Sequence, residues 1–113
     1  MSDGKGGSID ITIVSFTKDT KIESKNFYIL QDELQRLVSQ GQFNIIMDFD
    51  NVSYVSSAGL GVLCAIREQS SGLGGDIKLI NMSPKIRNLF DMLGFSRLFR
   101  IFADEQAALN DFV

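Results

Sequence analysis

The chain has 113 residues, a net charge of −3, one cysteine and no histidine. This length predicts one domain that folds without disulfide support, and the absence of histidine excludes Ser-His-Asp and Cys-His catalysis and removes the usual zinc ligand. The acidic balance, without a cluster of lysines and arginines, argues against nucleic-acid binding.

The sequence also argues against a membrane protein or a secreted one. No apolar run approaches the ~18 residues that a bilayer span needs, and the first residues contain no apolar signal region. The single Cys64 cannot form an intramolecular disulfide, which fits a reducing compartment. We therefore expect a cytoplasmic protein, monomeric when free, that is not an enzyme and uses no metal or cofactor.

The first residues predict a tail followed by a strand. Residues 1–8 are rich in glycine and predict a disordered tail, which leaves residues 9–113 as the single domain. Ile9, Ile11 and Ile13 alternate with polar residues, which predicts a strand with one buried face.

A short strand and a helix are predicted next. Residues 21–23 favour a brief return strand after a polar turn. Between residues 26 and 40 apolar residues recur every three or four positions, which is typical of an amphipathic helix, and Gly41 is a plausible end for it.

The central stretch predicts a buried strand that leads into a helix. Residues 45–49 are apolar except for Asp48, which is typical of a strand covered on both faces. Ser56 and Ser57 stand directly before an apolar helix over about residues 57–70, so one of them is the predicted N-cap. Between strand and helix, turn chemistry is supplied by Asp50, Asn51 and Ser53.

The second half continues the alternation. Residues 76–82 predict a strand, Ser83 and Pro84 begin a helix as N-cap and first helical residue, and Gly94 ends it. The predicted buried stripe of that helix is Ile86, Leu89, Phe90 and Leu93.

The last elements complete an α/β domain. Residues 97–102 are an apolar segment with room for one short strand, and Asp104 is the predicted cap of a last helix that ends near Phe112. Alternating strands and helices predict a largely parallel sheet. With the first two strands as an antiparallel edge, we expect a mixed sheet of four to five strands covered by about four helices.

The serine pair lies where a helix can stabilise an anion. The first N–H groups of a helix lack intrahelical partners and carry about half a positive charge, which stabilises an anion by about 0.3–1 kcal/mol. Ser57 can therefore carry a phosphate without breaking the helix behind it. A purely structural capping role for Ser56 or Ser57 explains the same residues, and both interpretations stay open.

The helix after the serines is too apolar for a narrow buried stripe. Either it is almost fully buried or its first turn exposes an apolar patch, so Leu60 is a candidate both for docking a partner and for the core. Leu63 and Ile66 are assigned to the core, and Gly59 and Gly61 to close packing of the helix. The apolar residues concerned are Leu60, Val62, Leu63, Cys64 and Ile66.

Two carboxylates end the central strand. Asp48 and Asp50 have no third ligand beside them, so a metal site is not expected. Asp48 is interpreted as orienting the turn at Ser57 by hydrogen bonding, and Asp50 as a turn residue.

The segment from Met47 to Leu63, with Ser-Ser-Ala-Gly-Leu-Gly at its centre, resembles the signature of the STAS domain of bacterial anti-sigma factor antagonists. The resemblance extends over about residues 9–112. With Gly59 and Leu60 in register, Ser57 falls on the family's phosphorylatable serine, and Ser56 replaces the usual aspartate and is the alternative acceptor.

The resemblance implies a binding module controlled by phosphorylation. When unphosphorylated it binds a serine-kinase anti-sigma factor and so frees a sigma factor, and a PP2C-type phosphatase restores this form. A scaffold subunit of a larger signalling assembly and a nucleotide-binding STAS domain are the alternatives. The implied partner-binding residues are Ser56, Ser57, Ala58, Gly59, Leu60 and Asp48.

Overall fold

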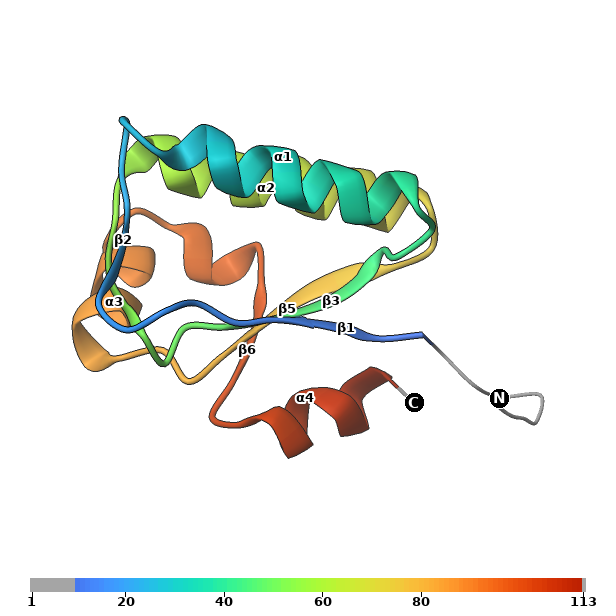
Figure 1. The fold of residues 1–113 in the computed structure, drawn as a ribbon. Coiled ribbons are helices and arrows are strands. Elements are labelled where there is room, and N and C mark those ends of the chain that lie inside the picture. Colours follow the sequence, from blue (N-terminus) through green and yellow to red (C-terminus); the bar gives the residue numbers. More distant parts are fainter. Residues whose placement is uncertain (1–9, 113) are drawn as a thin grey trace.

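The computed structural model describes residues 10–112, and the predicted tail at residues 1–8 lies outside them. Within that range six strands, four helices and one short 3₁₀ turn form an α/β domain (Figure 1). The strands are β1 (Thr12–Val14), β2 (Thr20–Ile22), β3 (Asn44–Asp48), β4 (Val52–Val55), β5 (Asp76–Ile80) and β6 (Arg100–Phe102). The helices are α1 (Phe27–Ser39), α2 (Ser57–Gly72), α3 (Pro84–Met92) and α4 (Glu105–Phe112), and the 3₁₀ turn η1 is Phe95–Arg97.

All strand pairs in the described part of the chain are parallel. Four strands form a sheet in the order β1-β3-β5-β6, and β2 and β4 pair as a separate two-stranded sheet. The predicted antiparallel edge, and with it the mixed sheet, is therefore wrong. The reason is that β2 does not fold back on β1. The chain turns at Asp19, whose φ is 61°, and β2 then pairs in parallel with β4.

Helices cover both faces of the four-stranded sheet. Figure 1 shows α1 and α2 together on one face and α4 on the other, and α1 and α2 also contact each other. Because side chains alternate along a strand, β3 and β5 bury residues on both faces. Residues facing α1 and α2 include Ile45, Met47, Ile77 and Leu79, and those facing α4 include Ile46 and Ile80.

The helix predictions are confirmed in their main features. The buried face of α1 consists of Leu30, Leu34, Leu37 and Val38, at the predicted spacing of three and four residues. Gly41 follows α1 with a φ of 83°, a conformation that glycine adopts without strain.

None of the helices within residues 10–112 combines the length and apolarity that crossing a bilayer requires.

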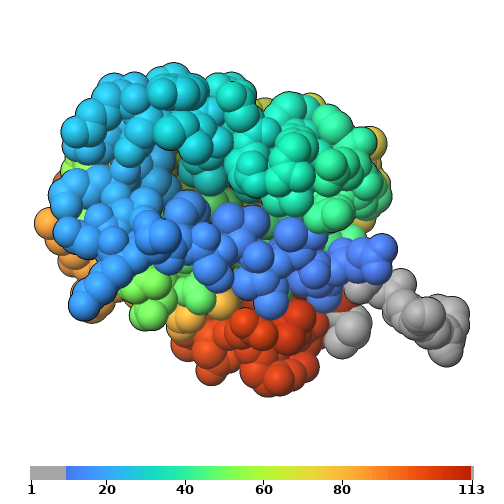
Figure 2. Space-filling view, in the orientation of Figure 1, coloured from blue at the N-terminus to red at the C-terminus, as the bar shows by residue number. Residues whose placement is uncertain are grey.

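Two residues assigned to buried faces are exposed instead. Leu93 is 50% exposed, because α3 ends at Met92 and the chain turns away at Gly94. Ile13 is 41% exposed because β1 is an edge strand, while α4 packs on β3, β5 and β6. In the space-filling view, β1 lies on the surface between α1 and α4 (Figure 2).

Candidate functional site

Ser56 is the N-cap of α2. Its backbone is extended, with φ −82° and ψ 169°, and its hydroxyl oxygen accepts a hydrogen bond from the N–H of Gly59 at 3.3 Å. The N–H of Ser56 donates to the carbonyl oxygen of Ile22 at 2.7 Å, which fixes the start of α2 on β2. The capping function predicted for one of the two serines thus belongs to Ser56.

Ser57 is the first residue of α2, and its side chain is exposed. Its hydroxyl forms no hydrogen bond with any residue in the described part of the chain, so it is available to a reagent from outside. The first turn of α2 contains no acidic residue, so nothing in that turn opposes an anion at the positive end of the helix dipole. The two serines therefore differ chemically although they are neighbours in the sequence.

Gly59 allows the first turn of α2 to approach β2 and β4. A Cβ atom at Gly59 would lie 2.6 Å from Cγ2 of Ile22 and 3.2 Å from Cγ1 of Val55. A Cβ atom at Gly61 would meet nothing within 4 Å. The prediction of close packing is confirmed for Gly59 and wrong for Gly61, which faces open space.

Leu60 belongs to the core and does not present a docking side chain. It is 0% exposed and lies in the main hydrophobic cluster with Leu63 and Ile66. Of its two open interpretations, exposure as a docking residue is wrong, because α2 packs against α1, β4 and β5 and Leu60 lies within the cluster that they form. Ala58 is half-buried, so Ser57 is the most outward-facing residue among the first four of the helix.

The surface beside the serines includes residues that the sequence did not single out. A shallow hollow of about 280 Å³ borders Ser56 and is lined by Tyr54 of β4, which is 42% exposed, and by the loop before α1. Asp50, Asn51 and Ser53 were expected to form a turn between strand and helix, so the strand β4 and the outward direction of Tyr54 could not be predicted. The loop residues in this hollow are Glu23, Ser24 and Lys25.

Within residues 10–112, Asp48 forms no hydrogen bond with Ser57. Its Oδ1 accepts hydrogen bonds from the backbone N–H of Asp50 at 2.9 Å and from the side-chain amide of Asn81 at 3.1 Å. The expectation that Asp48 orients the turn at Ser57 by hydrogen bonding therefore stays a prediction, and the hydrogen bonds that Asp48 forms are to residues outside that turn. Asp48 instead joins the carboxyl ends of β3 and β5, and so holds the β3–β4 turn that precedes β4 and the serines.

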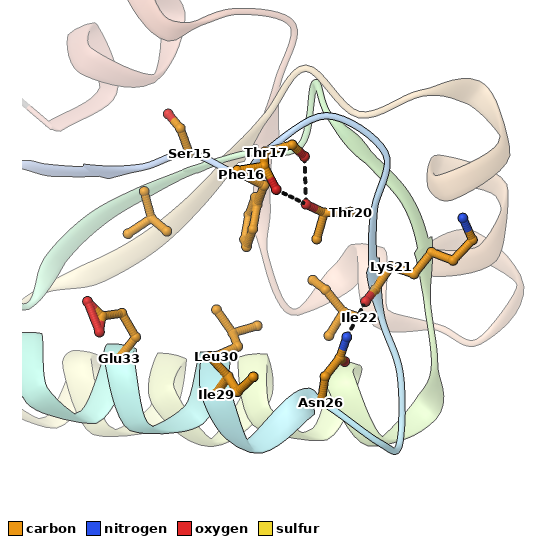
Figure 3. A pocket seen from close by; sticks show the side chains of 11 residues that line it. Ser15, Phe16, Thr17, Thr20, Lys21, Ile22, Asn26, Ile29, Leu30 and Glu33 are labelled. Carbon is orange, nitrogen blue, oxygen red and sulfur yellow. Dashed lines mark hydrogen bonds between the residues drawn. The ribbon is translucent and has the colours of Figure 1, made fainter.

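A second hollow of about 490 Å³ lies between the β1–β2 segment and α1 (Figure 3). Phe16, Ile22 and Leu30 point into it, whereas the ammonium group of Lys21 is directed away. Lys21 belongs to the lining, but its ammonium group does not point into the hollow, so this hollow does not favour the nucleotide-binding alternative. Among residues 10–112 no three His, Cys, Asp or Glu side chains are grouped closely enough to bind a metal ion.

Cys64 packs against the core from α2 and is partly buried. Desolvation by this burial raises the pKa of its thiol above the usual value. Since the thiolate is the reactive form, this environment favours the packing function predicted for Cys64 over a reactive thiol.

Comparison with known proteins assigns the family. The STAS domain family matches residues 9–108, which is most of the sequence. The chain therefore belongs to the STAS domain family, and the serine pair lies at the segment that carries the resemblance.

Within this family the chain groups with the anti-sigma factor antagonists. It is 31% identical over 82 residues to the anti-sigma-B factor antagonist of Bacillus subtilis, a match that covers 73% of this chain and 74% of that protein. It is 30% identical over 91 residues to BtrV of Bordetella bronchiseptica, named as a candidate anti-sigma factor antagonist, with 80% and 78% covered. The structure of the anti-sigma factor antagonist SpoIIAA in its unphosphorylated form shares the fold, with a TM-score of 0.76 at 18% identity over 94% of this chain and 90% of that one.

Proposed function

We propose that this protein is an anti-sigma factor antagonist whose binding to its partner is controlled by phosphorylation of Ser57. The observation that supports this proposal is the difference between the two serines: the Ser56 hydroxyl is occupied by capping, and the Ser57 hydroxyl is exposed and unengaged. A second support is that SpoIIAA, which shares the fold, is known in an unphosphorylated and a phosphorylated form.

The unphosphorylated protein binds a serine-kinase anti-sigma factor and so frees a sigma factor for transcription. The docking surface is the exposed start of α2, with Ser57 at its centre and Tyr54 beside it. Gly59, Leu60 and Asp48 belong to this site through the backbone that they position, since Leu60 is buried and Asp48 binds Asn81. The protein is thus a binding module and a kinase substrate, not an enzyme.

Phosphorylation ends the association by adding charge. The kinase transfers the γ-phosphoryl group of ATP to Oγ of Ser57, which loses its proton, and a PP2C-type phosphatase later hydrolyses the ester. The phosphate adds about −1.5 to −2 charges, and enclosing it in an interface without matched cations costs several kcal/mol. Since about 1.4 kcal/mol is a factor of ten in affinity, this cost weakens binding by about a hundredfold or more.

The test combines intact-mass measurement, peptide mapping and titration calorimetry with serine-kinase anti-sigma factors from the same genome. Ser57→Ala should bind the kinase with unchanged affinity and gain no phosphate. Ser57→Asp should bind at least tenfold more weakly, because its carboxylate supplies part of the phosphate charge.

Ser56→Ala is the matched control, one residue away. It removes a hydroxyl that already accepts a hydrogen bond, so phosphorylation at Ser57 should continue. Modification that maps to Ser56, or equal affinity of the wild type and Ser57→Asp, would contradict the proposal.

A further inference from the structure

Three arginines from different elements line one hollow at the far end of α2 from the serines. Arg67 comes from α2, Arg97 from η1 and Arg100 from β6, and they share a hollow of about 420 Å³. Ser71 contributes a hydroxyl one helical turn after Arg67, and Asp76 contributes a carboxylate. No motif in the sequence brings these residues together; the fold does.

The charges in this hollow are only partly balanced. Arg100 forms two contacts with Asp111, from Nε to Oδ2 at 2.7 Å and from Nη2 to Oδ1 at 2.9 Å. Asp76 accepts from the buried Lys78 at 3.4 Å, so its charge is also matched.

Arg67 and Arg97, in contrast, form neither an ion pair nor a side-chain hydrogen bond with any of residues 10–112. Arg67 is half-buried, and an ion withdrawn from water without a partner is costly. The hollow therefore carries excess positive charge on a protein whose net charge is −3.

Guanidinium groups bind oxyanions through pairs of parallel N–H donors, and phosphate matches this geometry better than a monatomic anion does. Arg100 is held in place by Asp111, which leaves Arg67 and Arg97 free to donate to a ligand. We propose that this hollow is a binding site for the phosphate group of a small anionic molecule, with Arg67 and Arg97 as its main donors and Ser71 as a third.

This site is separate from Ser57. Ser71 follows Ser57 by 14 residues on the same helix, and at about 1.5 Å per residue the two lie about 21 Å apart along its axis. The proposal thus does not depend on the phosphorylation of Ser57, and each can fail while the other stands.

The test is a titration of the full-length, isotope-labelled protein with inorganic phosphate and, separately, glycerol 3-phosphate, followed by amide NMR shifts at constant ionic strength. Saturable shifts are expected at the amides of Ser71 and Leu98. Arg97→Gln, at an exposed position, and Arg67→Gln should each weaken binding about tenfold, since each removes a charge-assisted donor.

Arg87→Gln is the control, because Arg87 is exposed and pairs with Asp91 on its own helix, and its replacement removes the same charge outside the hollow. Its binding should equal that of the wild type. If glycerol 3-phosphate binds more tightly than inorganic phosphate, the site is assigned to phosphate esters. If the two bind equally, the site is assigned to free phosphate. Absence of saturable shifts, or an equal loss in Arg87→Gln, would overturn the proposal.

Discussion

Replacing Gly59 by alanine, with Gly61→Ala as its matched control, measures how tightly the start of α2 packs on β2. Both glycines lie within the first turns of the same helix. A Cβ atom at Gly59 would lie 2.6 Å from Cγ2 of Ile22, a residue that is 3% exposed, whereas one at Gly61 would meet nothing within 4 Å. The two substitutions therefore share their chemistry and differ in the space available.

The expected effects have opposite signs. Alanine in place of glycine favours a helix by up to about 1 kcal/mol, so Gly61→Ala should raise the free energy of unfolding by about 0.5–1 kcal/mol. At Gly59 the same gain is opposed by overpacking, which costs about 1–3 kcal/mol. Ile22 is β-branched and cannot rotate Cγ2 away cheaply, so β2 itself must shift. We expect the two variants to differ by about 1–3 kcal/mol.

Urea denaturation followed by far-UV circular dichroism measures this difference, with equal m-values as the condition for comparing midpoints. Thermal denaturation should show the same order, with Gly59→Ala melting several degrees below Gly61→Ala. If Gly59→Ala is as stable as Gly61→Ala, the close contact with Ile22 does not limit packing and the reasoning fails.

Two further predictions concern a cap and an ion pair. Ser56→Ala should lower the free energy of unfolding by about 1 kcal/mol through loss of the N-cap, whereas Ser57→Ala should change it little, as thermal denaturation of both will show. Hydrogen bonds from Lys78 and Arg100 lower the pKa of Asp111 in the folded protein. The ionised carboxylate therefore stabilises the fold fully above its unfolded pKa of about 3.9, and this stabilisation is lost as the pH falls through the lower folded pKa. Asp111→Asn should accordingly melt at a lower temperature at pH 7, and the gap to the wild type should narrow below about pH 4; a constant gap would contradict this assignment.

The features that the sequence predicted well are governed by neighbours along the chain. Ser83 accepts from the N–H of Ile86 at 3.2 Å, and Asp104 accepts from the N–H of Ala107 at 2.9 Å, as expected for N-caps. An N-cap interacts with a backbone N–H within the next three residues, so its residue type and position are sufficient to predict it. The same locality explains why the junction of strand, serine and helix could be placed before the fold was known.

The features that could not be predicted depend on distant partners. Asp48 binds Asn81, which lies 33 residues away, and no local pattern indicates that choice over Ser57. The burial of Leu60 depends on the packing of α2 against α1, β4 and β5, so the apolar sequence of the helix alone could not decide between core and docking. The parallel pairing of β2 with β4 is also long-range, and a short strand after a turn is equally compatible with a hairpin.

Under the proposed function, the residues of the first turn of α2 that stabilise the fold are different from the residue that is phosphorylated. Ser56 caps the helix, Gly59 packs on Ile22 and Leu60 fills the core, so only Ser57 can gain charge without disturbing the fold. A negative charge at this position also interacts favourably with the helix dipole, by about 0.3–1 kcal/mol. Ser57→Asp should therefore bind its partner more weakly while unfolding at an equal or higher free energy. Weaker binding together with lower stability would instead show that the switch acts by local unfolding, because a purely electrostatic switch leaves the packed residues in place.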